Sequence, residues 1–154
     1  MSTNYSTQIY ANKVPALTAH GNYNVSTHLH AISGTISTWA AGDTINVGYL
    51  PANAVVVSAT LKAASQLDSN GTPTLTLSLG TSATAGLFKS AITTVGRSSG
   101  ASADQTLAAG GVLYKPTAKT LVLVTVGAAA ATAVAGTLEV DIEFYVEDAT
   151  GTNP

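Results

Sequence analysis

The stretch Asp43-Thr-Ile-Asn-Val-Gly-Tyr-Leu-Pro-Ala-Asn-Ala-Val-Val-Val-Ser-Ala-Thr-Leu-Lys62 decides the fold class of this chain. Pro51 fixes its own φ angle and Asn53 tolerates a positive one, so the residues around them are typical of a tight turn. The β-branched run Val55-Val-Val57 suits a pleated, buried surface better than a helix. The stretch therefore predicts two strands joined by a turn, and we expect them to pair as a hairpin over residues 44–64.

Further strands are predicted on both sides of this stretch. Residues 74–79 and 138–146 alternate between apolar and polar side chains, which is the pattern of a strand with one buried face. In the second segment the apolar face holds Leu138, Val140, Ile142, Phe144 and Val146. Residues 25–39 also alternate, 112–116 resemble a short edge strand ended by proline, and 87–95 fit either a strand or a short helix.

These segments follow one another at short intervals, and none has a convincing amphipathic helical period. The 154 residues are enough for one domain with a single core. We therefore expect an all-β fold, an antiparallel two-sheet sandwich of jelly-roll-like form, at residues 23–148. An extended N-terminal arm at residues 1–22 and a C-terminal tail at residues 149–154 complete the expected organisation.

One uncharged segment, residues 121–138, approaches the length of a membrane span. Its second half consists of Ala, Thr, Val and Gly, and Gly127 and Gly136 interrupt it. This composition favours a β-hairpin with a loop of small residues over a membrane helix. We expect no membrane partner.

The composition of the chain limits its partners. Charged residues make up 9% of the sequence, the net charge is −2, and the six Lys and Arg residues form no basic stripe. Binding to nucleic acid therefore lacks its electrostatic basis. A hydroxyl-rich surface with little charge offers weak repulsion between copies, which favours a homo-oligomer.

Catalytic and cofactor motifs are not found in the sequence, which also lacks cysteine. His28 and His30 lie on one face of a strand and form at most a weak metal pair. The acidic row from Glu139 to Glu147 could hold a cation, but its spacing is the solvent period of a strand. We expect no catalytic, cofactor-binding or metal-binding residues, and we interpret both sets as surface or interface residues.

Aromatic and arm residues supply the remaining candidates. Trp39 with Tyr23, Tyr49 and Tyr114 could form a platform for sugars, although a lone tryptophan is more often a core or interface anchor. Arms of oligomeric proteins often lie across a neighbouring subunit, although a disordered end is an equal alternative. The predicted interface residues are Tyr5, Ile9, Tyr10, Val14, Leu17, His28, His30 and Trp39.

Three segments together resemble a known group of proteins. They are Val47-Gly-Tyr-Leu-Pro-Ala-Asn-Ala-Val-Val-Val-Ser-Ala59, Pro73-Thr-Leu-Thr-Leu-Ser-Leu-Gly-Thr-Ser82 and Gly136-Thr-Leu-Glu-Val-Asp-Ile-Glu-Phe-Tyr-Val146. This order resembles small β-sandwich virion proteins of tailed bacteriophages, particularly head decoration or cement proteins. The likeness spans residues 42–147 and specifies no site.

The resemblance implies a non-enzymatic structural protein on the outside of the phage head. It implies a homotrimer that binds the major capsid protein and bridges neighbouring capsomers. The polar N-terminus lacks the pattern of a signal peptide, which fits synthesis in the host bacterial cytoplasm. Alternatives are a tail or fibre module that binds glycan receptors and a jelly-roll coat protein.

Overall fold

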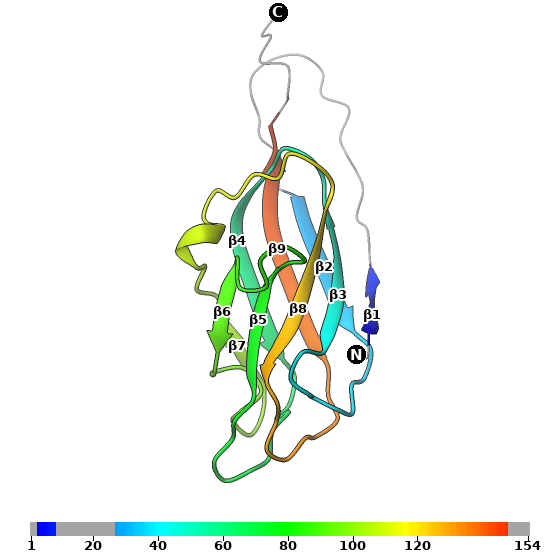
Figure 1. The fold of residues 1–154 in the computed structure, drawn as a ribbon, viewed down its shortest axis with the longest axis vertical. Coiled ribbons are helices and arrows are strands. Elements are labelled where there is room, and N and C mark those ends of the chain that lie inside the picture. Colours follow the sequence, from blue (N-terminus) through cyan, green and yellow to red (C-terminus); the bar gives the residue numbers. More distant parts are fainter. Residues whose placement is uncertain (1–2, 9–26, 148–154) are drawn as a thin grey trace, which may run out of the picture.

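The computed structural model describes residues 3–8, of which only the backbone is placed, and residues 27–147. They form a nine-stranded β-structure with a single short 3-10 helix (Figure 1). Among these residues there is no helix with the length and apolar character needed to cross a bilayer. The elements are β1 (Thr3–Gln8), β2 (Thr27–Ser33), β3 (Thr44–Leu50), β4 (Ala54–Ala63), β5 (Thr76–Thr81), β6 (Lys89–Ile92), β7 (Ser102–Asp104), η1 (Ala109–Gly111), β8 (Thr120–Ala128) and β9 (Leu138–Val146).

The strands are arranged as two antiparallel sheets that face each other. One sheet has the order β6-β5-β8-β3 and the other has the order β2-β9-β4-β7. From β2 onward every connection except β5–β6 passes from one sheet to the other, an alternation typical of a jelly roll. The predicted all-β, two-sheet sandwich is therefore confirmed.

Strand β1 lies between the sheets at one edge, where it joins β3 to β2. It pairs in parallel with β3 and antiparallel with β2. The expected N-terminal arm is thus described only over Thr3–Gln8, where its backbone is part of the sandwich. Residues 9–22 of that arm and the tail at residues 149–154 lie outside the described residues.

The central stretch forms the two predicted strands, but the prediction that they pair as a hairpin is wrong. Strand β3 pairs with β8 and β4 pairs with β9, so the turn at Pro51–Asn53 carries the chain from one sheet to the other. Asn53 has the positive φ angle, 62°, that its position in the turn predicted. The local pattern therefore fixed the turn, while the pairing depends on strands distant in sequence.

The structure also decides the outcome for three other predicted elements. Residues 121–138 are not a hairpin, because β8 and β9 belong to different sheets. Residues 112–116 are not a strand, although Leu113 and Tyr114 make backbone hydrogen bonds to Val56. Within residues 87–95 the strand alternative is the one observed, as β6.

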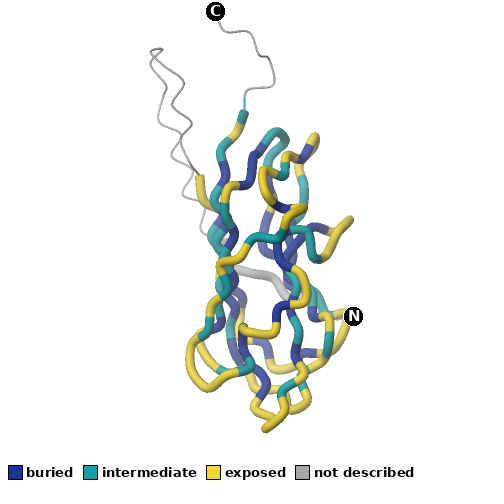
Figure 2. Tube along the Cα trace, turned by 90° about the vertical axis from the view of Figure 1, so that its left-hand side faces the viewer, coloured by how far each residue is buried: buried dark blue, intermediate teal, exposed yellow. Residues whose placement is uncertain are grey.

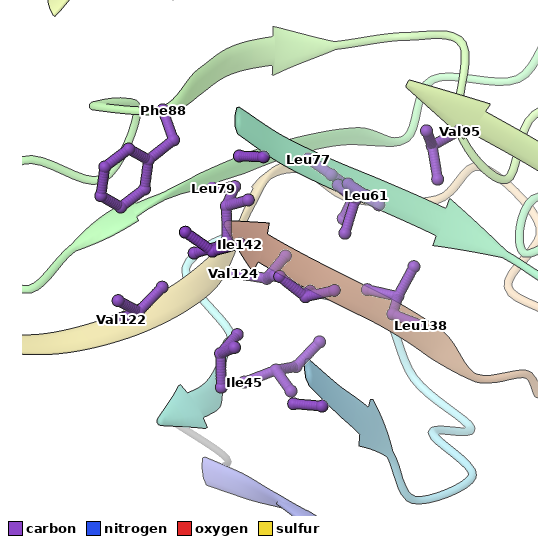
Figure 3. Packing of buried hydrophobic residues seen from close by; sticks show 14 of the residues in the cluster. Ile45, Leu61, Leu77, Leu79, Phe88, Val95, Val122, Val124, Leu138 and Ile142 are labelled. Atoms are coloured by element: carbon purple, nitrogen blue, oxygen red, sulfur yellow. The ribbon is translucent and has the colours of Figure 1, made fainter. Parts of the chain in front are cut away.

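The core fills the space between the two sheets. Leu77, Leu79, Val122 and Val124 from one sheet face Leu61, Leu138 and Ile142 from the other (Figure 3). Burial follows the strands, whereas the loops at both ends of the molecule are largely exposed (Figure 2). The inward face predicted for β9 is buried up to Phe144, and only Val146 at its end is exposed.

Asp68 organises the loops that lie at the lower end of the molecule in Figure 1. Its side chain is fully buried and its two carboxylate oxygens accept five backbone N–H groups. Oδ2 accepts those of Thr74, Leu75 and Ala131, and Oδ1 accepts those of Asn70 and Thr132. The carboxylate therefore ties the loop before β5 to the loop after β8 and closes this end of the core.

Candidate interaction surfaces

The outer face of the β2-β9-β4 sheet gathers most of the predicted polar candidates. In the register of these strands, Glu143 lies between His28 and Ser58, Asp141 lies between His30 and Thr60, and Glu139 lies between Ile32 and Lys62. The acidic side chains of β9 thus form a central column, flanked by histidines on β2 and by polar residues on β4. We call Glu139, Asp141, Glu143, His28, His30 and Lys62 the carboxylate ladder.

Each histidine of the ladder pairs diagonally. Its partner is not the β9 carboxylate directly opposite but the one two residues earlier in the chain. His28 Nδ1 lies 3.0 Å from Asp141 Oδ1, and His30 Nε2 lies 3.8 Å from Glu139 Oε1. On the other side of the column, Lys62 Nζ lies 3.4 Å from Glu139 Oε1. Because these side chains are a third to a half exposed, the pairs contribute little to folding and remain accessible to a partner.

The ladder was also considered as a metal site, because it combines histidines with carboxylates. Among the described residues, no three His, Cys, Asp or Glu side chains converge as ligands of one ion. Its carboxylates lie on the outer face of one sheet and are partly paired with histidine and lysine side chains from neighbouring strands. This arrangement suits contact with a polar or cationic surface.

A second surface is apolar. Val57, Val112 and Leu113 have exposed fractions of 47%, 54% and 62%. The Leu113 N–H donates to the Val56 carbonyl and the Val56 N–H donates to the Tyr114 carbonyl, both at 3.1 Å, which holds these residues at one edge of β4. We call Val57, Val112 and Leu113 the apolar tip.

The backbone of the apolar tip is strained. Leu113 has a φ angle of 54°, in the left-handed region that leucine rarely adopts. Such a conformation costs on the order of 1 kcal/mol and persists only where surrounding bonds enforce it. Here it presents an exposed leucine to solvent, which is the combination expected at a contact with another molecule.

The edge formed by β6 and β7, opposite β1, contains a buried ion pair. Lys89 Nζ donates to Asp104 Oδ1 at 2.9 Å and also to the Thr106 carbonyl, and the lysine side chain is 1% exposed. Burial raises the pKa of Asp104, but the hydrogen bond and charge of Lys89 lower it more, so the carboxyl remains ionised. An open groove of about 340 Å³ lies over this pair, lined mainly by residues 89–94.

Both charged groups under this groove are already partnered. The Thr94 hydroxyl donates to Asp104 Oδ2, and the Thr106 N–H donates to Asp104 Oδ1. Every buried side-chain nitrogen and oxygen among the described residues has a hydrogen-bond partner. The pair therefore holds two edge strands together and offers no unsatisfied group to a ligand.

The predicted interface residues lie in different places. His28 and His30 are on the carboxylate ladder, whereas Trp39 is 2% exposed and its indole N–H donates to the Val134 carbonyl at 2.9 Å. Tyr5 lies in β1, where only the backbone is described. Ile9, Tyr10, Val14 and Leu17 lie outside the described residues.

The aromatic residues of the sugar-platform alternative do not come together. Trp39 is in the core, Tyr114 packs edge-on against Phe88, and Tyr49 is exposed on β3 with the Lys119 ammonium over its ring. Tyr23 lies outside the described residues. The described aromatic side chains therefore form no shared exposed platform.

Neither the apolar tip nor the buried ion pair was predicted from the sequence. Residues 112–116 matched an edge strand, and neither the exposure nor the φ angle of Leu113 is visible in that pattern. Lys89 and Asp104 are two among 14 charged residues scattered along the chain. Only the three-dimensional pairing of the sheets brings them together.

Comparison with known proteins gives a consistent set of neighbours. A scan of protein-family models and a search of curated proteins gave no match. The fold is similar to a chain of the cyanophage Pam1 capsid asymmetric unit, with a TM-score of 0.70 and 28% identity, covering 90% of this chain and 97% of that one. It is also similar to a chain of the capsid of Ralstonia phage GP4, with a TM-score of 0.64 and 27% identity, covering 97% and 100%.

A third neighbour shares the fold alone. It is a chain of the acid-stable capsid of Helicobacter pylori bacteriophage KHP30, with a TM-score of 0.56 and 16% identity over 80% of this chain and 90% of that one. All three neighbours are chains of phage capsids. The resemblance to virion proteins of bacteriophages is therefore confirmed, and the comparisons support a structural protein of a phage virion that associates with other capsid chains.

Proposed function

We propose that this chain is a phage capsid decoration protein, which binds the outside of the head as a trimer and stabilises it by bridging neighbouring capsomers. The observation that carries the proposal is the match to two phage capsid chains over 97% and 100% of their lengths. Those chains therefore have about the length and the fold of this one. A chain that folds as one small sandwich suits an accessory subunit attached to a lattice that a larger major capsid protein builds.

The surfaces of the molecule support this role. The carboxylate ladder gives a polar face, and the apolar tip gives an exposed hydrophobic edge held by strained backbone. A decorating subunit needs a surface for the shell as well as surfaces for its neighbours, and the exposed apolar tip suits the contact with the shell. The low charge of the chain keeps repulsion between copies small.

The mechanism is thermodynamic linkage rather than catalysis. A protein that binds the assembled lattice, but not free coat subunits, lowers the free energy of the assembled state by its binding free energy. A trimer engages several capsomers at once, so the second and third contacts form at high effective concentration. Modest contacts are thereby multiplied over the many copies on one head.

Heating heads with and without the protein tests the proposal. Heads of the encoding phage, produced without this protein, should release their DNA at a lower temperature than heads to which it has been added back. Addition that leaves the release temperature unchanged would remove the decoration role. Assembly of the purified protein into shells by itself would favour the coat alternative, and glycan binding without head binding would favour the tail alternative.

A further inference from the structure

Strand β1 occupies a gap between β3 and β2, where its backbone pairs with both strands. Residues Thr3–Tyr5 pair with Thr44–Asn46 of β3, and residues Ser6–Gln8 pair with Ala31–Ser33 of β2. Each half of the strand therefore has one hydrogen-bonded neighbour, first from one sheet and then from the other. These backbone contacts form equally well whether the strand belongs to the same subunit or to another copy.

The connection that follows β1 is far longer than its own sheet requires. Gln8 lies opposite Ala31, four residues along β2 from Thr27, where the connection ends. At strand spacings these two points are about 15 Å apart. The 18 residues from 9 to 26 could extend over about 60 Å. Neighbouring antiparallel strands are usually joined by a few residues, so this connection has far more reach than its own subunit requires.

The composition of the connection points the same way. It contains Ile9, Tyr10, Val14 and Leu17 among polar residues. A loop that only joins two strands of one subunit over the surface has no need of four large apolar side chains. A segment that crosses onto a neighbour would bury them, and their removal from water would stabilise the assembly.

We propose that β1 is exchanged between subunits, so that the strand of each copy fills the gap between β3 and β2 of its neighbour. The inference rests on the trimer proposed above and specifies how its subunits are joined. Exchange around a ring preserves every β1 backbone hydrogen bond and adds the contacts of the connection. Separation of two subunits then requires withdrawal of a strand from a sheet, which makes the assembly slow to dissociate on dilution.

Disulfide trapping distinguishes exchange from pairing within one chain. Because the chain has no native cysteine, only the introduced cysteines can form disulfides. Thr7 and Ile32 are register partners, and Ile32 is exposed to an oxidant. A tagged Thr7→Cys chain is co-expressed with an untagged Ile32→Cys chain, the mass of the native assembly is measured by light scattering, and the sample is oxidised. Thr7→Cys with Thr60→Cys is the matched control, since Thr60 on β4 is separated from β1 by β2 and β9.

Exchange predicts a covalent species that contains one chain of each type, absent from the control pair. It also predicts covalent trimers from a chain that carries both Thr7→Cys and Ile32→Cys. A trimer mass with only intrachain disulfides in the double variant would overturn the exchange and leave the trimer intact. A monomer mass before oxidation would overturn the proposed trimer, and failure of both variants to form any disulfide would show that β1 does not occupy the gap.

Discussion

Lys89 and Asp104 join the two sheets at the edge opposite β1, with Lys89 Nζ 2.9 Å from Asp104 Oδ1 and the lysine side chain almost fully buried. Lys89 belongs to β6 at the end of one sheet and Asp104 to β7 at the end of the other. The sandwich is thus closed by backbone pairing through β1 on one side and by a buried ion pair on the other.

Removal of the acidic partner should cost more stability than removal of the lysine. Asp104→Asn leaves a buried ammonium without a countercharge and should lower the free energy of unfolding by about 3 kcal/mol. Lys89→Met should cost less, because the partly exposed Asp104 carboxylate can be hydrated while the methionine fills the buried space. Urea unfolding of the two variants checks this order, and equal losses would argue against it.

The Asp68 carboxylate should make the fold sensitive to acid. Burial raises the pKa of Asp68, but hydrogen bonds from the backbone of Thr132, Ala131, Leu75 and Thr74 lower it further, so it lies well below the ordinary carboxyl value. A lowered folded-state pKa adds stability that is present above the unfolded pKa of about 4 and is lost as the pH falls below it.

Asp68→Asn should therefore lower the free energy of unfolding by about 3 kcal/mol at neutral pH, because an amide NH₂ would face backbone donors. It should also flatten the loss of stability between about pH 4 and pH 2, measured by urea unfolding across that range. Asp43→Asn is the matched control, since the Asp43 side chain accepts one exposed backbone N–H, from Ala40, at 3.2 Å. An acid profile of Asp68→Asn parallel to that of the wild type would contradict this role.

The Leu113 side chain should contribute to head binding and not to the stability of the fold. Asparagine tolerates a positive φ angle, so Leu113→Asn should leave the free energy of unfolding unchanged or raise it by about 1 kcal/mol. The same substitution removes apolar surface from the tip and should weaken association with heads, measured by co-sedimentation. Val134→Thr, at a less exposed position in the loop before β9, is the control and should bind as the wild type does. Unaltered head binding by Leu113→Asn would show that the tip is not a contact.

Trp39 offers a direct probe of the core, because it is the only tryptophan in the chain. Its burial and its hydrogen bond to the Val134 carbonyl predict blue-shifted emission that iodide quenches poorly in the native state. Unfolding should shift the emission to the red. Emission of the folded protein at the position of exposed tryptophan, or a change on addition of glycans, would revive the sugar-platform alternative.

Local sequence patterns predicted which side chains are buried far better than which strands are neighbours. The alternation over β9 correctly placed Leu138, Val140, Ile142 and Phe144 inward, because a strand has only two faces. The pattern around Pro51 predicted a turn but could not show that the turn crosses between sheets. Pairing is decided by contacts between residues as distant as Ser58 and Glu143, which no local window contains.

For the candidate surfaces too, the face of a strand was predictable from the sequence, whereas the partners of its side chains were not. His28 and His30 were predicted to share a strand face, and they do, but their carboxylate partners lie more than 100 residues away. The exposed Leu113 belongs to a segment that reads as an edge strand, and its φ angle depends on bonds to Val56. Residue type and period therefore predict faces, whereas sites formed between distant segments require the fold.

The central claim is that this protein attaches to a phage head, and binding to heads produced without it is the most direct test. Purified protein, titrated onto such heads and measured by co-sedimentation, should bind saturably, with a number of bound copies per head that is a multiple of three. The free protein should have three times the 15.4 kDa mass of the chain. Protein that remains in the supernatant at every concentration, while still folded, would contradict the account.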